Sequence, residues 1–124
     1  MNIAFRRWLA ASLFFWISTT ACAQVSLMPG QSLSVNQQLV SVGGLYRLIM
    51  QGDGNLAYYR ANNTSRWDAG TNGTGAVVAV MQGDGNFVIY DSNGRAVWAT
   101  NTSGRPGAYL TTQTDGNLVV YWNG

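Results

Sequence analysis

A nine-residue motif occurs three times in this chain at a constant spacing of 31 residues. The copies are Gln51-Gly-Asp-Gly-Asn-Leu-Ala-Tyr-Tyr59, Gln82-Gly-Asp-Gly-Asn-Phe-Val-Ile-Tyr90 and Gln113-Thr-Asp-Gly-Asn-Leu-Val-Val-Tyr121. Trp67 and Trp98 repeat with the same spacing. A fixed period of this length is typical of proteins built from repeated units that share one core. The register divides the chain into units 43–73, 74–104 and 105–124, and the last is truncated before a third Trp.

Each unit has the pattern of β-structure. Turn residues such as Ser92-Asn-Gly94 separate short runs rich in Val, Ile, Tyr and Leu, and no window shows sustained helical spacing of apolar residues. We therefore expect an all-β fold of three small antiparallel sheets around a pseudo-threefold axis, with almost no helix. Trp67 and Trp98 are expected in the central core. The segment 24–42, which carries no motif, is expected to complete the sheet of the third unit.

Residues 1–23 have the pattern of a signal peptide. Arg6 and Arg7 precede about ten apolar residues, too few to span a bilayer, and Ala21-Cys22-Ala23 fits the cleavage pattern. Cleavage would leave a secreted, cysteine-free domain of residues 24–124. The alternatives are a buried core helix, twin-arginine export, retention in the periplasm, or a lipid anchor at Cys22, although Thr19 departs from the lipid-anchor pattern.

The composition excludes several classes of function. The sequence has no His, Lys or Glu, and its only Cys belongs to the signal segment, so nucleophilic triads and Schiff-base chemistry are unavailable. One Asp per motif cannot form the carboxylate pair of a glycosidase, so we predict no enzymatic activity. The motif also falls short of the six or more ligands of calcium, so no metal or cofactor is expected.

The charge balance bears on the partners of the domain. Beyond residue 23, five Arg balance five Asp. A near-neutral domain without Lys gives no support to nucleic-acid binding. Once the signal segment is removed, no stretch is expected to insert into a membrane.

The polar residues of the motif indicate a ligand with adjacent hydroxyls. If the motif is one strand, Gln82, Asp84, Asn86, Val88 and Tyr90 share a face, because alternate residues of a strand point the same way. A merely solvated face would accept many polar residues, whereas the same amide, carboxylate, amide and phenol return in all three copies. Together they offer fixed donors and acceptors a few ångströms apart.

These motifs, together with the N-terminal stretch Leu27-Met-Pro-Gly-Gln-Ser-Leu33, resemble the bulb-type (monocot, snowdrop-like) mannose-binding lectin family. The resemblance covers essentially the whole chain after the signal segment. It implies a β-prism of three four-stranded sheets, each with one site for mannose or a mannose-containing glycan. It also implies that Asp and Asn bind the axial 2-hydroxyl, Gln the 3-hydroxyl and Tyr the 4-hydroxyl, while Val contacts the apolar face of the sugar.

The implied carbohydrate-binding residues are Gln51, Asp53, Asn55, Tyr59, Gln82, Asp84, Asn86, Val88, Tyr90, Gln113, Asp115, Asn117, Val119 and Tyr121. Ala57 replaces the Val of the first motif, so the first site is expected to be the weakest. Gly54 stands where some members have a disulfide-forming Cys.

The short third unit leaves several interpretations open. The third sheet closes in another way, or its open edge pairs with another copy in a homodimer, or the chain is incomplete. Two alternative functions also remain: a β-prism with decayed sugar binding that serves as a protein-interaction module, and a lectin-like bacteriocin. Bacteriocins of this kind generally carry two such domains.

Overall fold

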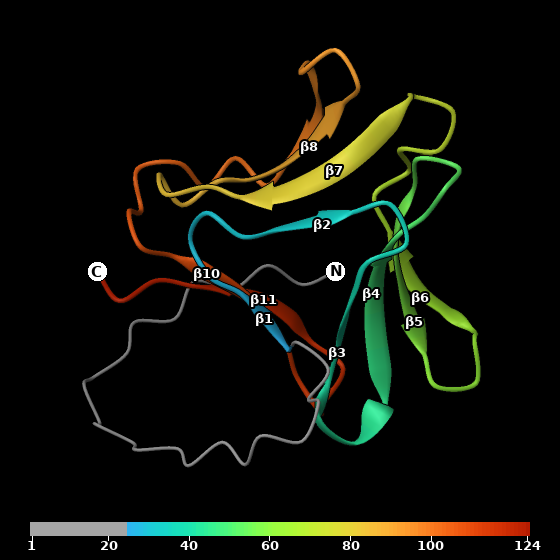
Figure 1. The fold of residues 1–124 in the computed structure, drawn as a ribbon. Coiled ribbons are helices and arrows are strands. Elements are labelled where there is room, and N and C mark those ends of the chain that lie inside the picture. The colour runs from blue at the N-terminus through green and yellow to red at the C-terminus, as the bar shows by residue number, and fades with distance from the viewer. Residues whose placement is uncertain (1–24) are drawn as a thin grey trace.

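The computed structural model describes residues 25–124, so the predicted signal peptide lies outside the described residues. The regular elements of the described part are β-strands joined by turns and loops, with one short 3-10 helix (Figure 1). The elements are β1 (Ser26–Leu27), β2 (Ser32–Ser34), β3 (Gln38–Val40), η1 (Val42–Gly44), β4 (Tyr46–Met50), β5 (Leu56–Arg60), β6 (Ser65–Asp68), β7 (Ala76–Met81), β8 (Phe87–Asp91), β9 (Ala96–Ala99), β10 (Tyr109–Thr112) and β11 (Leu118–Tyr121). Within residues 25–124, no helix is long and apolar enough to cross a membrane.

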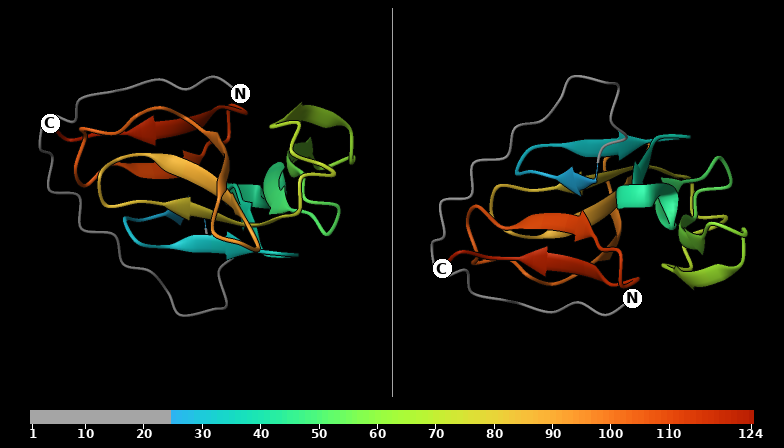
Figure 2. Two further views of the ribbon diagram at one scale, coloured as in Figure 1. Left: turned by 90° about the horizontal axis from the view of Figure 1, so that it is seen from above. Right: turned by 90° about the horizontal axis from the view of Figure 1, so that it is seen from below.

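The strands form three antiparallel sheets around one core, which confirms the predicted fold class. Sheet 1 has the order β3-β4-β5-β6, sheet 2 has β2-β7-β8-β9, and sheet 3 has β1-β10-β11. The views from above and below show the teal-to-green strands of sheet 1 to one side of sheets 2 and 3, whose strands overlap in these views (Figure 2). Sheet 3 has three strands in the described residues, whereas the family resemblance implied four in each sheet.

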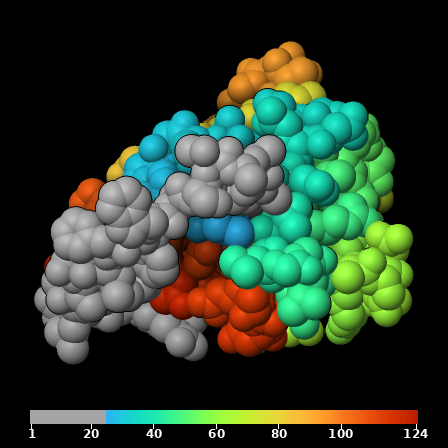
Figure 3. All heavy atoms as spheres, turned by 60° about the horizontal axis from the view of Figure 1, so that its bottom comes forward, coloured from blue at the N-terminus to red at the C-terminus, as the bar shows by residue number. Residues whose placement is uncertain are grey.

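The N-terminal segment contributes one strand to each sheet. Only β1 joins sheet 3, while β2 pairs with β7 in sheet 2 and β3 pairs with β4 in sheet 1. The expectation that this segment completes the third sheet is thus confirmed for β1, whereas β2 and β3 complete the other two sheets. The space-filling view shows the segment, blue to teal, running along one face beside residues of all three sheets (Figure 3).

A six-residue period explains the path of this segment. Leu27, Leu33 and Leu39 are fully buried, one per strand. Gly30 and Asn36 lie between them with φ of 87° and 69°, the left-handed conformation that these residue types tolerate best. Each leucine therefore anchors one strand in the core, and each left-handed residue turns the chain toward the next sheet.

Aromatic side chains fill the core differently from the prediction. Tyr58 and Phe87 are fully buried, whereas Trp67 and Trp98 are half-buried and pack against the core with ring centres 5.6 Å apart. The two Trp residues lie on β6 and β9, the edge strands of sheets 1 and 2, so part of each ring stays in contact with solvent. The central position expected for Trp67 and Trp98 is thus only partly correct.

Candidate functional site

The polar half of each motif forms a tight turn. In sheet 1, the segment 51–55 joins β4 to β5, and Gln51 N–H donates to the carbonyl of Asn55 at 2.9 Å. Gly54 has a φ of 89°, which favours glycine, and its N–H donates back to the Gln51 carbonyl at 3.1 Å. The corresponding turns are 82–86 and 113–117. The interpretation of the motif as one strand was therefore wrong for its first half. In sheet 1, residues 51–55 form a turn with Gly54 in the left-handed conformation, and the strand begins only at Leu56.

The motif aspartates stabilise these turns. In all three copies the Asp Oδ1 accepts the backbone N–H of the Asn two residues later, at 2.9 Å. This is the local hydrogen bond that favours Asp in turns. The three Asp side chains, Asp53, Asp84 and Asp115, are exposed. In the first two copies the second carboxylate oxygen, Oδ2, is left to accept a hydrogen bond from a ligand.

Two buried threonines orient the motif asparagines. Thr71 N–H donates to Asn55 Oδ1 at 3.1 Å, and Thr102 N–H donates to Asn86 Oδ1 at 3.2 Å. The hydroxyls of the same threonines donate to the carbonyls of Gly54 at 2.7 Å and Gly85 at 2.5 Å. Because each Asn oxygen is engaged from inside the protein, the Asn NH₂ group is the part left to donate to a ligand.

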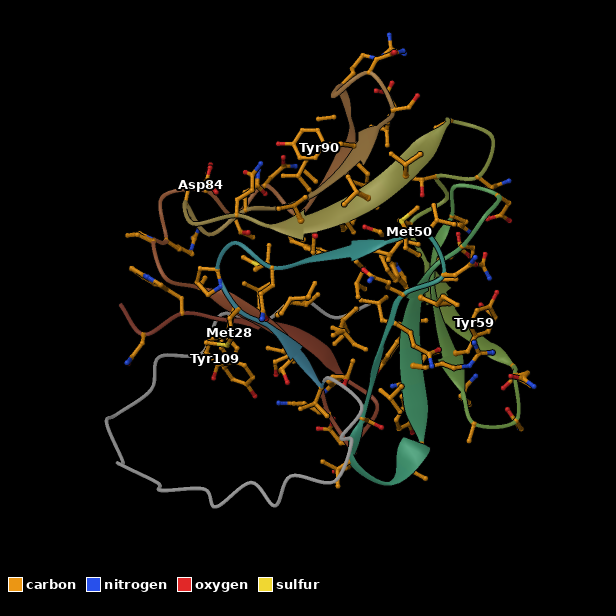
Figure 4. The ribbon with its side chains drawn as sticks, in the orientation of Figure 1. Met28, Met50, Tyr59, Asp84, Tyr90 and Tyr109 are labelled. Atoms are coloured by element: carbon orange, nitrogen blue, oxygen red, sulfur yellow. The ribbon has the colours of Figure 1, made fainter. Side chains whose placement is uncertain are left out.

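Each motif pairs its Gln with its Tyr. Gln51 Nε2 donates to the Tyr59 hydroxyl at 2.5 Å, and Gln82 and Gln113 make the same bond to Tyr90 and Tyr121. In sheets 1 and 2, the Gln carbonyl oxygen and the phenolic proton are a neighbouring acceptor and donor for a ligand. Tyr59 and Tyr90 point away from the core on separate sheets, and Asp84 lies on the turn that leads into the strand of Tyr90 (Figure 4).

A small apolar side chain lies between the turn and the Tyr in each site. Ala57, Val88 and Val119 occupy this place and are only 2%, 3% and 1% exposed. The apolar contact that each can offer a ligand is therefore limited, and polar groups dominate the accessible surface of each site.

The structure thus brings together the predicted residues of one motif, but it keeps the three motifs on three different sheets. Within residues 25–124, no group of three or more His, Cys, Asp or Glu side chains could hold a metal ion. The described sites are therefore sets of hydrogen-bonding groups around one small apolar residue each.

The third motif turn is held by the first unit. Arg66 Nε donates to the Gly116 carbonyl at 2.7 Å, the position that corresponds to the carbonyls held by Thr71 and Thr102. The Arg66 guanidinium carbon lies 5.6 Å from the ring centre of Tyr46. Tyr46 stacks in turn on Tyr58 at 5.8 Å, and burial raises the pKa of the Tyr58 hydroxyl to about 12.

Replacing Arg66 by Met is expected to loosen the third turn and leave the other two unchanged. Met keeps much of the apolar stem but loses the Nε donor, a hydrogen bond worth about 0.5–1.5 kcal/mol. Amide hydrogen exchange at Gly116 and Asn117 should accelerate roughly two- to tenfold. Gly54 and Gly85 serve as internal controls, and equal acceleration at all three turns would contradict a local role for Arg66.

Sequence reasoning missed Thr71, Thr102 and Arg66. The two threonines are 31 residues apart and could have been found from the repeat alone. Arg66 carries no such signal, because residue 97, its counterpart in the second unit, is Val. Its role depends on contact between sheets 1 and 3, which only the three-dimensional structure shows.

No protein-family model matches the chain, and no curated protein matches it. Solved structures do match. A monomeric monocot mannose-binding lectin from Gastrodia elata is 43% identical, with a TM-score of 0.71 over 81% of this chain and 89% of the lectin. The mannose-specific agglutinin of snowdrop (Galanthus nivalis) bulbs, solved with methyl-α-D-mannoside, is 34% identical, with a TM-score of 0.72 over 79% of this chain and 89% of the agglutinin.

The similarity extends to a fungal protein. A Marasmius oreades lectin is 33% identical, with a TM-score of 0.76 over 82% of this chain and 84% of the lectin. The three sheets, the motif turn in each sheet and these identities lead to one assignment. The chain belongs to the bulb-type mannose-binding lectin family.

Proposed function

We propose that this protein is a secreted lectin that binds mannose or mannose-containing glycans through up to three repeated sites. One observation carries the proposal: the motif Asp, Gln and Tyr side chains make the same internal hydrogen bonds at all three hairpin turns, and a buried threonine orients the motif Asn in two of them. Fixing these groups before binding lowers the entropic cost of holding a small, polar ligand.

In sheet 2, the groups that can still bind a ligand match the hydroxyls of a mannose ring. In sheet 2, Asp84 Oδ2 accepts and the Asn86 NH₂ group donates, so both can engage the axial 2-hydroxyl. At the other end, the Gln82 carbonyl oxygen and the Tyr90 hydroxyl engage the 3- and 4-hydroxyls. Galactose, with an equatorial 2-hydroxyl and an axial 4-hydroxyl, would leave groups at both ends without partners.

The expected affinity of one site is low. Four or five hydrogen bonds contribute about 0.5–3 kcal/mol each, before association costs of several kcal/mol, so a dissociation constant near the millimolar range follows. Sites on three sheets can engage a branched or polymeric glycan together, which can raise the overall affinity by about 10²–10⁴. This arrangement favours glycan capture over chemical conversion of the sugar.

The test is a titration of the purified, secreted protein with mannose, glucose and galactose, followed by ¹H–¹⁵N NMR. Millimolar mannose should shift the backbone amides of Asn86, Val88, Asn117 and Val119, with weaker shifts at Ala57. Galactose is the matched control and should leave these amides in place. The absence of shifts at tens of millimolar mannose would contradict the proposal.

Secretion is proposed from the signal-peptide pattern of residues 1–23. Pairing of two chains through the edge of sheet 3 stays a prediction.

A further inference from the structure

The site on sheet 1 has a cationic residue opposite its motif Tyr, a place that an uncharged residue occupies in the other two sheets. Arg47 on β4 lies directly opposite Tyr59 on β5, and its guanidinium carbon is 4.8 Å from the centre of the Tyr59 ring. The residue opposite the motif Tyr is Val78 in sheet 2 and Tyr109 in sheet 3. The three otherwise similar sites therefore differ in charge beside the phenol.

Internal contacts hold Arg47 in this place. Its Nη2 donates to Asn63 Oδ1 at 2.6 Å, and Asn63 has a φ of 66° at the β5–β6 turn. Among residues 25–124, the ion pair found joins Arg95 to Asp91. No described carboxylate therefore forms an ion pair with Arg47. Its remaining N–H groups form a cationic fork that can donate two parallel hydrogen bonds to an oxyanion.

A carboxylate lies on the other side of the same site, on β6. Asp68 on β6 lies opposite Ala57, where sheet 2 has Ala99 opposite Val88. The Asp68 Oδ1 accepts the N–H of Gly70 at 2.8 Å, which leaves its second oxygen exposed. The sheet 1 site is thus positive on the β4 side, next to Tyr59, and negative on the β6 side.

We propose that the sheet 1 site binds a mannose-configured sugar that carries an oxyanion on C6, either a carboxylate or a phosphate. This inference rests on the proposed function, in which the Tyr59 hydroxyl binds the 4-hydroxyl of the ring. C6 is attached to C5, the neighbour of C4, so a group on C6 lies at the Tyr59 end of the site. Arg47 then contributes a charge-assisted contact that offsets the methyl groups lost with Ala57.

The experiment compares three probes: methyl α-mannoside, its 6-phosphate, and the methyl glycoside of mannuronic acid. Backbone amides of Ala57 and Tyr59 report on sheet 1, and those of Val88 and Tyr90 report on sheet 2. At low salt we expect about three- to tenfold tighter binding of at least one anionic probe than of the neutral probe at sheet 1. Sheet 2 should show no such preference.

Two matched variants, at Arg47 and Val78, and a third at Asp68 locate the anion preference. Arg47→Val installs the residue type that sheet 2 has at this place and should abolish the preference at sheet 1. The reciprocal Val78→Arg should create it at sheet 2. Asp68→Asn keeps an oxygen for the Gly70 N–H and should strengthen anion binding at sheet 1, because it removes the repelling charge.

The outcomes separate this inference from the proposed function. If methyl α-mannoside shifts sheet 2 while sheet 1 shows no anion preference, or if Arg47→Val leaves that preference unchanged, the inference is wrong and the lectin function stands. If no mannoside shifts any site, the proposed function fails and this inference fails with it. A preference for the phosphate alone, or for the carboxylate alone, supports the inference and identifies the anion.

Discussion

Replacing Gly85 by Ala is expected to destabilise the protein by about 3 kcal/mol or more and to disrupt the second motif turn. Gly85 has a φ of 93°, which costs a residue with a Cβ about 1–2 kcal/mol. A Cβ at this position would also overlap the carbonyl oxygen of Arg105 and lie 2.8 Å from its carbonyl carbon. Since these are backbone atoms, the clash is relieved only if the segment around Arg105 moves.

Two other glycines, in the turns of sheet 2, allow the cost of the positive φ to be measured apart from the cost of the clash with Arg105. Gly83 has neither a positive φ nor a neighbouring atom within 4 Å of a built Cβ, so Gly83→Ala should be nearly neutral. Gly94 has a φ of 77° in open space, so Gly94→Ala should cost only the conformational part, about 1–2 kcal/mol. Urea unfolding of the three variants measures each cost. A Gly85→Ala variant no less stable than Gly94→Ala would show that the close approach to Arg105 is not rigid.

The repeat explains why much of the fold could be predicted from the sequence. Three copies of one motif at constant spacing require three similar hairpins, and three hairpins with apolar strands share a core most simply as three sheets. The N-terminal segment escaped prediction because its signal is weak. Its period of six rests on single residues such as Leu33 and Gly30, while the nine-residue motif keeps five identical residues in all three copies.

For the candidate sites, the residues within one motif could be predicted from the sequence, whereas contacts between strands or sheets could not. Residues within one motif, such as Gln82 and Tyr90, recur together in all three copies, so the repeat alone indicates that they belong to one site. Arg47 and Tyr59 are 12 residues apart and become neighbours only because the turn fixes the register of β4 against β5. Contacts between sheets, such as that of Arg66 with Gly116, depend on packing that no local pattern encodes.

The double variant Asp84→Ala/Asp115→Ala is expected to lose nearly all retention on mannan-coated beads. Each carboxylate supplies a charge-assisted hydrogen bond worth about 1.5–3 kcal/mol, so each altered site should lose roughly 10- to 100-fold in affinity. Retention on a polymer also requires simultaneous engagement of more than one site. The remaining site, on sheet 1, has Ala57 in place of Val and cannot replace the lost avidity.

The control for this variant must preserve the turn, because Asp84 Oδ1 also accepts the N–H of Asn86. Asp84→Asn/Asp115→Asn keeps an oxygen for this bond and replaces the charged second oxygen by an NH₂ group, so it should stay folded and still lose most retention. Unfolding midpoints of both double variants then separate loss of binding from loss of the turn. Retention of the Asn variant at the wild-type level would show that the carboxylate charge does not hold the sugar, and equal retention of the Ala variant would remove Asp84 and Asp115 from the site altogether.

The single variants divide the effect further: if the sites act together through avidity, either one alone should lower retention far less than the pair does.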